Sequence, residues 1–264
     1  MNTAPDLSTT SIMMSVLLLA IPLLIVAYAK IGIVKNLIVS ALRMSIQLFL
    51  IGFFLEYLFR FNLWYVNLLW LVVMIAAAMF SVLKNAGLAI KAFALPVLGA
   101  FLIANIVVVL YFNFFIAAIP EVLDAKFVIA IGGMILGNSL HANIVGLGDF
   151  YQELRRNEGL YTYRLAFGAR KFEALFPFAQ KSFKAAISPT IATMATMGIV
   201  SLPGMMTGQI LGGSVPLTAI KYQIAIMIAI LASTMLSIML SVVFTVGKST
   251  DKWGMLRKNI FVSN

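Results

Sequence analysis

Apolar segments long enough to cross a lipid bilayer recur along the whole of this sequence. They fall at 10–29, 36–59, 64–83, 93–119, 127–147, 187–213 and 219–247. A transmembrane helix needs about 20 apolar residues, and an open strand in lipid would leave backbone groups unpaired. The sequence therefore predicts an all-α integral membrane bundle of about seven transmembrane helices.

The composition agrees with lipid surroundings. Hydrophobic residues make up 62% of the 264 residues and charged residues 11%, whereas a soluble domain has about 25% charged residues. Because the spans use most of the chain, we expect one transmembrane domain over residues 1–264. The net charge of +10 does not indicate nucleic-acid binding, since the basic residues lie between apolar runs and form no continuous polar surface. We expect a multi-pass protein of the cell membrane.

The positions of Lys and Arg predict the orientation of the bundle. If the N-terminus is outside, the outer connections hold only Arg60, Lys126 and Lys221, and most other basic residues lie in inner connections. Cytoplasmic loops of membrane proteins carry such an excess of positive charge. The sequence therefore predicts an N-out, C-in topology.

The longest connection, at 148–186, lies on the predicted inner side. It is too charged to span a membrane and too rich in Leu, Phe and Tyr for a flexible linker. We interpret it as helical extensions that flank a turn at Phe167-Gly168-Ala169.

The sequence contains no recognisable catalytic site. Gly247-Lys248-Ser249-Thr250 resembles the end of a P-loop, but the glycine required five positions earlier is Val242. There is no cysteine, and His141 is the only histidine, so no thiolate site or paired-histidine zinc site can form. We expect the chain to be no enzyme and to bind no cofactor of its own.

Polar groups inside spans are the candidates for a substrate pathway, because lipid makes them costly. Arg43 and Gln47 lie one turn apart in the second span, and Glu56 lies near its outer end. Asn138 and His141 lie in the fifth span. Structural roles stay open for them: Arg43 can snorkel to the inner lipid surface, Glu56 can be exposed at the outer rim, and the other two can pack between helices.

A helix break is predicted in the sixth span, at Pro203-Gly204. A broken helix at membrane depth is tolerated where it lines a cavity or packs tightly. Gly204, Gly208 and Gly212 recur every four residues, and Gly133 and Gly137 repeat this spacing in the fifth span. Such small-residue faces allow another helix to approach closely, and they predict helix packing at a subunit interface.

Metal contacts are predicted for Met205 and Met206, which follow the break. Their thioethers can bind a metal or a metal complex, although methionine also fills gaps between packed helices. Glu56 is the one plausible carboxylate ligand within a span.

Four segments resemble the permease subunit of the bacterial Fet-type iron-export ABC transporters, a family that includes a plant half-transporter linked to aluminium tolerance. They lie at 43–48, 133–138, 200–208 and 219–224, and the resemblance extends over about 36–247. It implies a seven-span permease that works with a separate ATPase subunit, and two permeases that pair with two ATPases. ATP would then bind to the partner, and iron, another metal or a metal complex would leave the cytoplasm.

The resemblance also implies that the inner connection couples the permease to the ATPase. The family's Leu-x-Leu-Gly-Ala core stands here as Leu165-Ala166-Phe167-Gly168-Ala169 after Arg164, with Phe167 in place of the second leucine. The acid expected before this core is absent, since Tyr161, Thr162 and Tyr163 occupy those positions.

Two other classes of function stay open from the sequence. A stand-alone secondary transporter or channel would use Arg43, Glu56 and the broken helix. A membrane assembly subunit that transports nothing would need no polar pathway. A neighbouring ATPase gene would distinguish the ABC permease from the stand-alone transporter.

Overall fold

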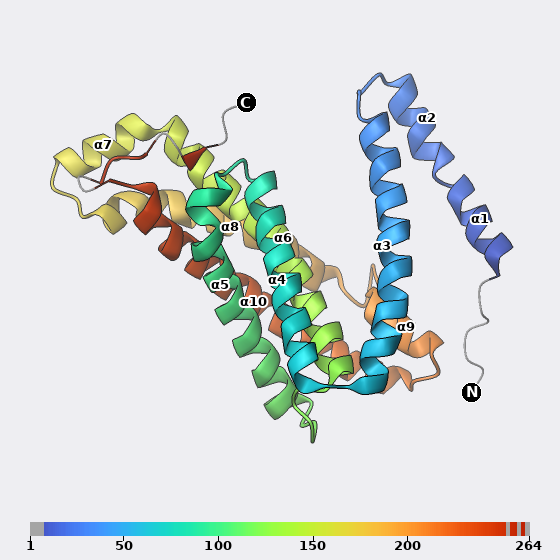
Figure 1. Ribbon diagram of the computed structural model, residues 1–264. Helices are drawn as coiled ribbons and strands as arrows, with labels where there is room; N and C mark the ends of the chain where they lie inside the picture. Colours follow the sequence, from blue (N-terminus) through green and yellow to red (C-terminus); the bar gives the residue numbers. More distant parts are fainter. Residues whose placement is uncertain (1–7, 252–253, 258–259, 262–264) are drawn as a thin grey trace.

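The computed structural model of the chain describes residues 8–251, 254–257 and 260–261. Within this part, the regular elements are helices, and strand pairing is limited to isolated bridges. The helices are α1 (Thr9–Leu17), α2 (Ala20–Tyr28), α3 (Val34–Phe61), α4 (Trp64–Asn85), α5 (Ile90–Tyr111), η1 (Phe112–Ile116), α6 (Ala125–Arg156), α7 (Glu158–Ala166), α8 (Lys171–Thr196), α9 (Gly204–Leu211) and α10 (Pro216–Ser249) (Figure 1). The predicted all-α class is confirmed.

Six helical segments in the described part are long and apolar enough to cross a membrane. They are Thr10–Tyr28, Val34–Phe61, Trp64–Asn85, Ile90–Ile116, Ala125–Arg156 and Pro216–Ser249. Each corresponds to one of the predicted spans, so the chain is a multi-pass membrane protein. The count of seven and the N-out, C-in orientation stay predictions.

The predicted span at 187–213 is not one continuous helix, and its break begins earlier in the chain than the sequence indicated. α8 ends at Thr196, and α9 begins only at Gly204. Between them the backbone leaves the helical region at Met197 (ψ 137°), and Gly198 adopts a positive φ of 85°. The expected break is therefore present, but it starts six residues before Pro203, where glycine permits the left-handed conformation.

The first three helices form an arm that stands apart from the other helices (Figure 1). Of the α3 side chains, only Leu58 is buried, and it packs with Ala125 and Ile129 at the start of α6. Asn62 ends α3 in the left-handed conformation, with φ 41°. The side-chain amide of Asn62 donates hydrogen bonds to Glu121 and Asp124, and these bonds tie the arm to the connection before α6.

Helices α4, α5, α6 and α10 pack into the main bundle. A buried face of α10 repeats small hydroxyl residues every four positions: Ser233, Ser237, Ser241, Thr245 and Ser249. Asn143 of α6 donates hydrogen bonds of 2.8 Å to the Ser139 carbonyl and to the Ser237 hydroxyl. Small residues let helices approach closely in membranes, and these bonds link α6 to α10.

The end of the bundle that carries α7 is closed by the segment after α10. The Tyr161 hydroxyl donates to the Gly254 carbonyl at 2.6 Å, and the Ala89 amide donates to the Ile260 carbonyl at 2.8 Å. Burial raises the pKa of Tyr161 above its usual value, and the nearby Asp251 carboxylate adds to this. The predicted inner connection is therefore mostly helical and folded against its surroundings.

Candidate functional site

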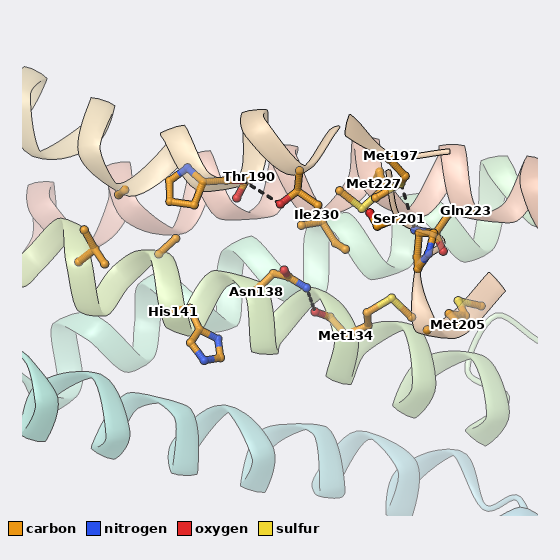
Figure 2. A pocket seen from close by; sticks show the side chains of 17 residues that line it. Met134, Asn138, His141, Thr190, Met197, Ser201, Met205, Gln223, Met227 and Ile230 are labelled. Carbon is orange, nitrogen blue, oxygen red and sulfur yellow. Dashed lines mark hydrogen bonds between the residues drawn. The ribbon is translucent and has the colours of Figure 1, made fainter. Parts of the chain in front are cut away.

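A cavity of about 500 Å³ lies between α6, α8, α9 and α10. Its wall consists of Met134, Asn138, His141, Ala142, Val145, Ala186, Pro189, Thr190, Thr193, Met197, Ser201, Pro203, Gly204, Met205, Gln223, Met227 and Ile230. Figure 2 shows the side chains of α6 on one side and those of the chain break and α10 across from them. The cavity has the size of a small-molecule or ion-complex site.

Helical spacing explains why these side chains meet. Met134, Asn138 and His141 are separated by four and three residues, so they share one face of α6. Gln223 and Met227 share a face of α10 for the same reason. The break after α8 turns the chain across the end of the cavity, and the backbone there brings Pro203, Gly204 and Met205 to its wall.

Several polar groups of the wall bond the protein itself. The Asn138 amide donates to the Met134 carbonyl at 2.9 Å, and the Thr193 hydroxyl donates to the Pro189 carbonyl at 2.9 Å. His141 Nδ1 lies 2.8 Å from the Gly137 carbonyl, a geometry that requires a proton on Nδ1.

The structure brings some of the predicted pathway residues together and separates others. Asn138, His141 and Met205 line the cavity, although they come from two helices far apart in the sequence. Met206 is buried and is not part of the cavity wall.

The pathway residues predicted on α3 lie away from this cavity. Arg43, Gln47 and Glu56 are exposed on the arm. Gln47 lines a separate cleft together with Phe54 of α3 and Trp70 of α4. In a membrane, these three side chains would face lipid, a second protein chain or the bilayer surface.

The predicted packing glycines differ in their surroundings. A Cβ atom on Gly133 would lie 3.0 Å from the Met74 side chain, so this glycine permits close packing of α6 on α4. At Gly137, Gly204 and Gly208 a Cβ atom would have no neighbour within 4 Å among the described residues. At Gly212 it would meet the Gly208 carbonyl of its own helix at 3.1 Å.

The residues predicted to couple to an ATPase lie at the turn between α7 and α8. Gly168 has φ 88°, so it supplies the left-handed conformation that the turn needs. Phe167 is 74% exposed and stacks on Tyr163, with ring centroids 4.4 Å apart. Leu165 and Ala169 instead pack against the core, and Arg164 is half-buried.

Sequence reasoning missed most of the polar and sulfur-containing wall. Met134, Met197, Met227, Thr193 and Gln223 line the cavity but were not predicted as site residues. A periodic signal existed, because Met134 stands one turn before Asn138 on the same face. No local pattern indicated that α8 and α10 would meet that face.

Comparisons with known proteins agree with a membrane protein. The chain is 30% identical to the UPF0014 membrane protein YjkA of Bacillus subtilis, over 82% of this chain and 85% of the relative. It is also 30% identical to the probable iron export permease protein FetB of Escherichia coli, over 84% of each chain. Identity to protein ALUMINUM SENSITIVE 3 of Arabidopsis thaliana is 27%, over 73% of this chain and 69% of the relative. No solved structure matches the chain.

These relatives support a membrane transport permease. Residues 9–249 match the family described as "Uncharacterised protein family (UPF0014)". That match covers nearly all of the helical part of the chain. The chain therefore belongs to the UPF0014 family of membrane proteins.

Proposed function

We propose that this chain is the permease subunit of an ABC exporter in the cell membrane, moving iron, another metal or a metal complex out of the cytoplasm. The observation that carries the proposal is the exposed aromatic turn after α7, which protrudes from the end of the bundle (Figure 1). The relative named as an iron export permease supports the same class of protein.

The α7 end has the properties of a docking element. Phe167, Tyr163 and Phe172 are exposed by 74%, 59% and 63%, respectively. At the same time, Tyr161 and Leu165 fix α7 to the segment around Gly254. Exposed aromatics on a rigid support are typical anchors of protein interfaces. An ATPase subunit that binds ATP would dock here, and this chain would bind no cofactor.

Force on this turn has a physical route to the cavity. α6 leads into α7, α8 leaves the turn, and both helices line the cavity. Glu153 of α6 and Lys181 of α8 form an ion pair of 3.0 Å between the two helices. ATP-driven movement of the turn would shift α6 and α8 together and change the shape of the cavity. The cavity must bind its cargo more weakly when it faces outward, because transport requires different affinities in the two states.

A homodimer of permeases is part of the proposal. α3 exposes an apolar surface along most of its length, including Leu42, Phe49 and Phe53. Gly204 and Gly208 form a small-residue face that nothing in the described part of the chain covers. A second copy would cover these surfaces and would shield Arg43 from lipid.

The test is ATPase activity in proteoliposomes that contain this chain and a candidate ATPase partner, without metal and with ferrous iron or Ag(I) added in turn. We expect activity to require both chains, to respond to one of these metals, and to fall strongly in Phe167→Ala and Gly168→Val. Phe114→Ala is the matched control, because Phe114 is also exposed but lies in η1, after the C-terminal end of α5.

Other outcomes would contradict the proposal. If no ATPase binds and solute flux follows an ion gradient, the chain is a secondary transporter, and Arg43 and Glu56 become the leading candidates for its site. If no flux occurs under any condition, the chain is an assembly subunit.

A further inference from the structure

The chemistry of the cavity wall restricts the cargo that it can hold. Four thioethers line it, from Met134, Met197, Met205 and Met227, and Figure 2 shows them around one space. The wall contains no carboxylate and no Lys or Arg. In the described part of the chain, no cluster of three or more His, Cys, Asp or Glu side chains can hold a metal. Any ligand would therefore meet neutral groups only.

The polar groups of this wall are amides, hydroxyls and one imidazole. One N–H of Asn138, the hydroxyl proton of Thr193 and the Nδ1 proton of His141 bond backbone carbonyls. The side-chain oxygens of Asn138 and Thr193 keep lone pairs for a ligand, and the hydroxyls of Thr190 and Ser201 can both donate and accept. The wall therefore offers a metal cation oxygen lone pairs and thioether sulfur without a carboxylate.

Gln223 adds an independent sign that a ligand is expected. This side chain is only 5% exposed, and its Nε2 reaches only Met197 Sδ, a weak acceptor, at 3.9 Å. Its Oε1 has no hydrogen-bond partner among the residues that the structure describes. Buried polar groups without partners are costly, so this amide at the cavity wall has an oxygen available to a bound ligand.

We propose that the cavity is a binding site for a soft monovalent metal cation of the Cu(I) class, held by the methionine thioethers of its wall. Thioethers select soft cations, whereas hard divalent and trivalent ions select carboxylates. A neutral wall offsets the desolvation of a single charge more easily than that of two or three charges. Flexible methionine side chains can close around an ion that is smaller than the cavity. This cargo class rests on the permease function proposed above.

The experiment measures binding of Ag(I), a stable substitute for Cu(I), to the full chain in chloride-free detergent by equilibrium dialysis and elemental analysis. Met134→Leu/Met205→Leu removes two thioethers with little change in volume. We expect one Ag(I) site of the wild-type chain to bind Ag(I) at least about tenfold more weakly in this variant. Met235→Leu/Met239→Leu is the control, because both methionines are exposed on α10 outside the cavity, and it should keep that site. Excess Fe(II) should not displace Ag(I) from it.

The proposal is overturned if both double variants bind Ag(I) like the wild type, or if Fe(II) displaces Ag(I) from the cavity. Size-exclusion chromatography and circular dichroism must show the same fold for all variants. Because binding is measured without an ATPase, the two proposals fail separately. Metal-stimulated ATPase activity without a methionine-dependent Ag(I) site would refute only the cargo class. An intact Ag(I) site without a partner ATPase would refute only the ABC permease.

Discussion

Replacing Asn62 tests how the arm is attached to the bundle. The side-chain oxygen Oδ1 of Asn62 accepts from the Ala125 backbone amide at 2.8 Å and from Asn67 Nδ2 at 3.1 Å. Its Nδ2 donates to Asp124 at 3.1 Å and to Glu121 at 3.3 Å. Asn67 keeps a second bond to the Leu123 carbonyl, but the buried Ala125 amide would lose its partner.

The expected loss can be divided into two parts. A lost hydrogen bond that leaves a buried donor unpaired costs about 1–3 kcal/mol, and the more exposed bonds add little. A residue other than glycine or asparagine at φ 41° costs about 1–2 kcal/mol more. Asn62→Ala should therefore lower the free energy of unfolding by about 2–5 kcal/mol. Asn62→Gly should be about 1–2 kcal/mol less harmful, because glycine accepts the left-handed conformation.

The assay is equilibrium unfolding of the purified chain in mixed detergent micelles, followed by circular dichroism. Asn85→Ala serves as the control, since Asn85 is exposed and bonds only Ser81 within its own helix. It should change the stability by less than about 0.5 kcal/mol. Equal stability of Asn62→Ala and Asn62→Gly would refute the conformational part. Wild-type stability of both would refute the role of the amide network.

Three further predictions concern the bundle and its α7 end. Asn143→Ala should lower the free energy of unfolding in detergent by about 1–2 kcal/mol, because it removes two buried bonds, and an unchanged stability would contradict the α6–α10 link. Glu153→Lys and Lys181→Glu should each lower the ATPase activity that requires both chains, and the double exchange should restore it. In a double-mutant cycle of unfolding, the interaction energy of this partly exposed pair should stay below about 1 kcal/mol. Tyr161→Phe should speed amide hydrogen exchange around Gly254. It should also make the free energy of unfolding depend less on pH above about pH 10. The raised pKa of Tyr161 stabilises the fold below about pH 10, and this contribution is lost as the pH rises through the pKa of Tyr161 in the folded state.

Much of the fold follows from local sequence patterns. Six of the predicted spans are helices of spanning length, because a run of apolar residues in lipid has only the helix to satisfy its backbone. The turn at Gly168 and the break at Pro203-Gly204 were predicted from residues whose backbone preferences act locally. Hydropathy did not predict that α8 would stop at Thr196, since residues on both sides of Met197 are apolar.

The candidate site depends on contacts that no local pattern encodes. The sequence determined that Asn138, His141 and Met205 are unusual at membrane depth, because polar and soft groups stand out against lipid-facing residues. Only the tertiary structure decided that they share a cavity with Gln223 and Met227, while Arg43 and Glu56 lie on a separate arm. Apolar periodicity fixes which residues lie on one helix face, but the packing of small residues such as Gly146 against Ile238 decides which faces meet.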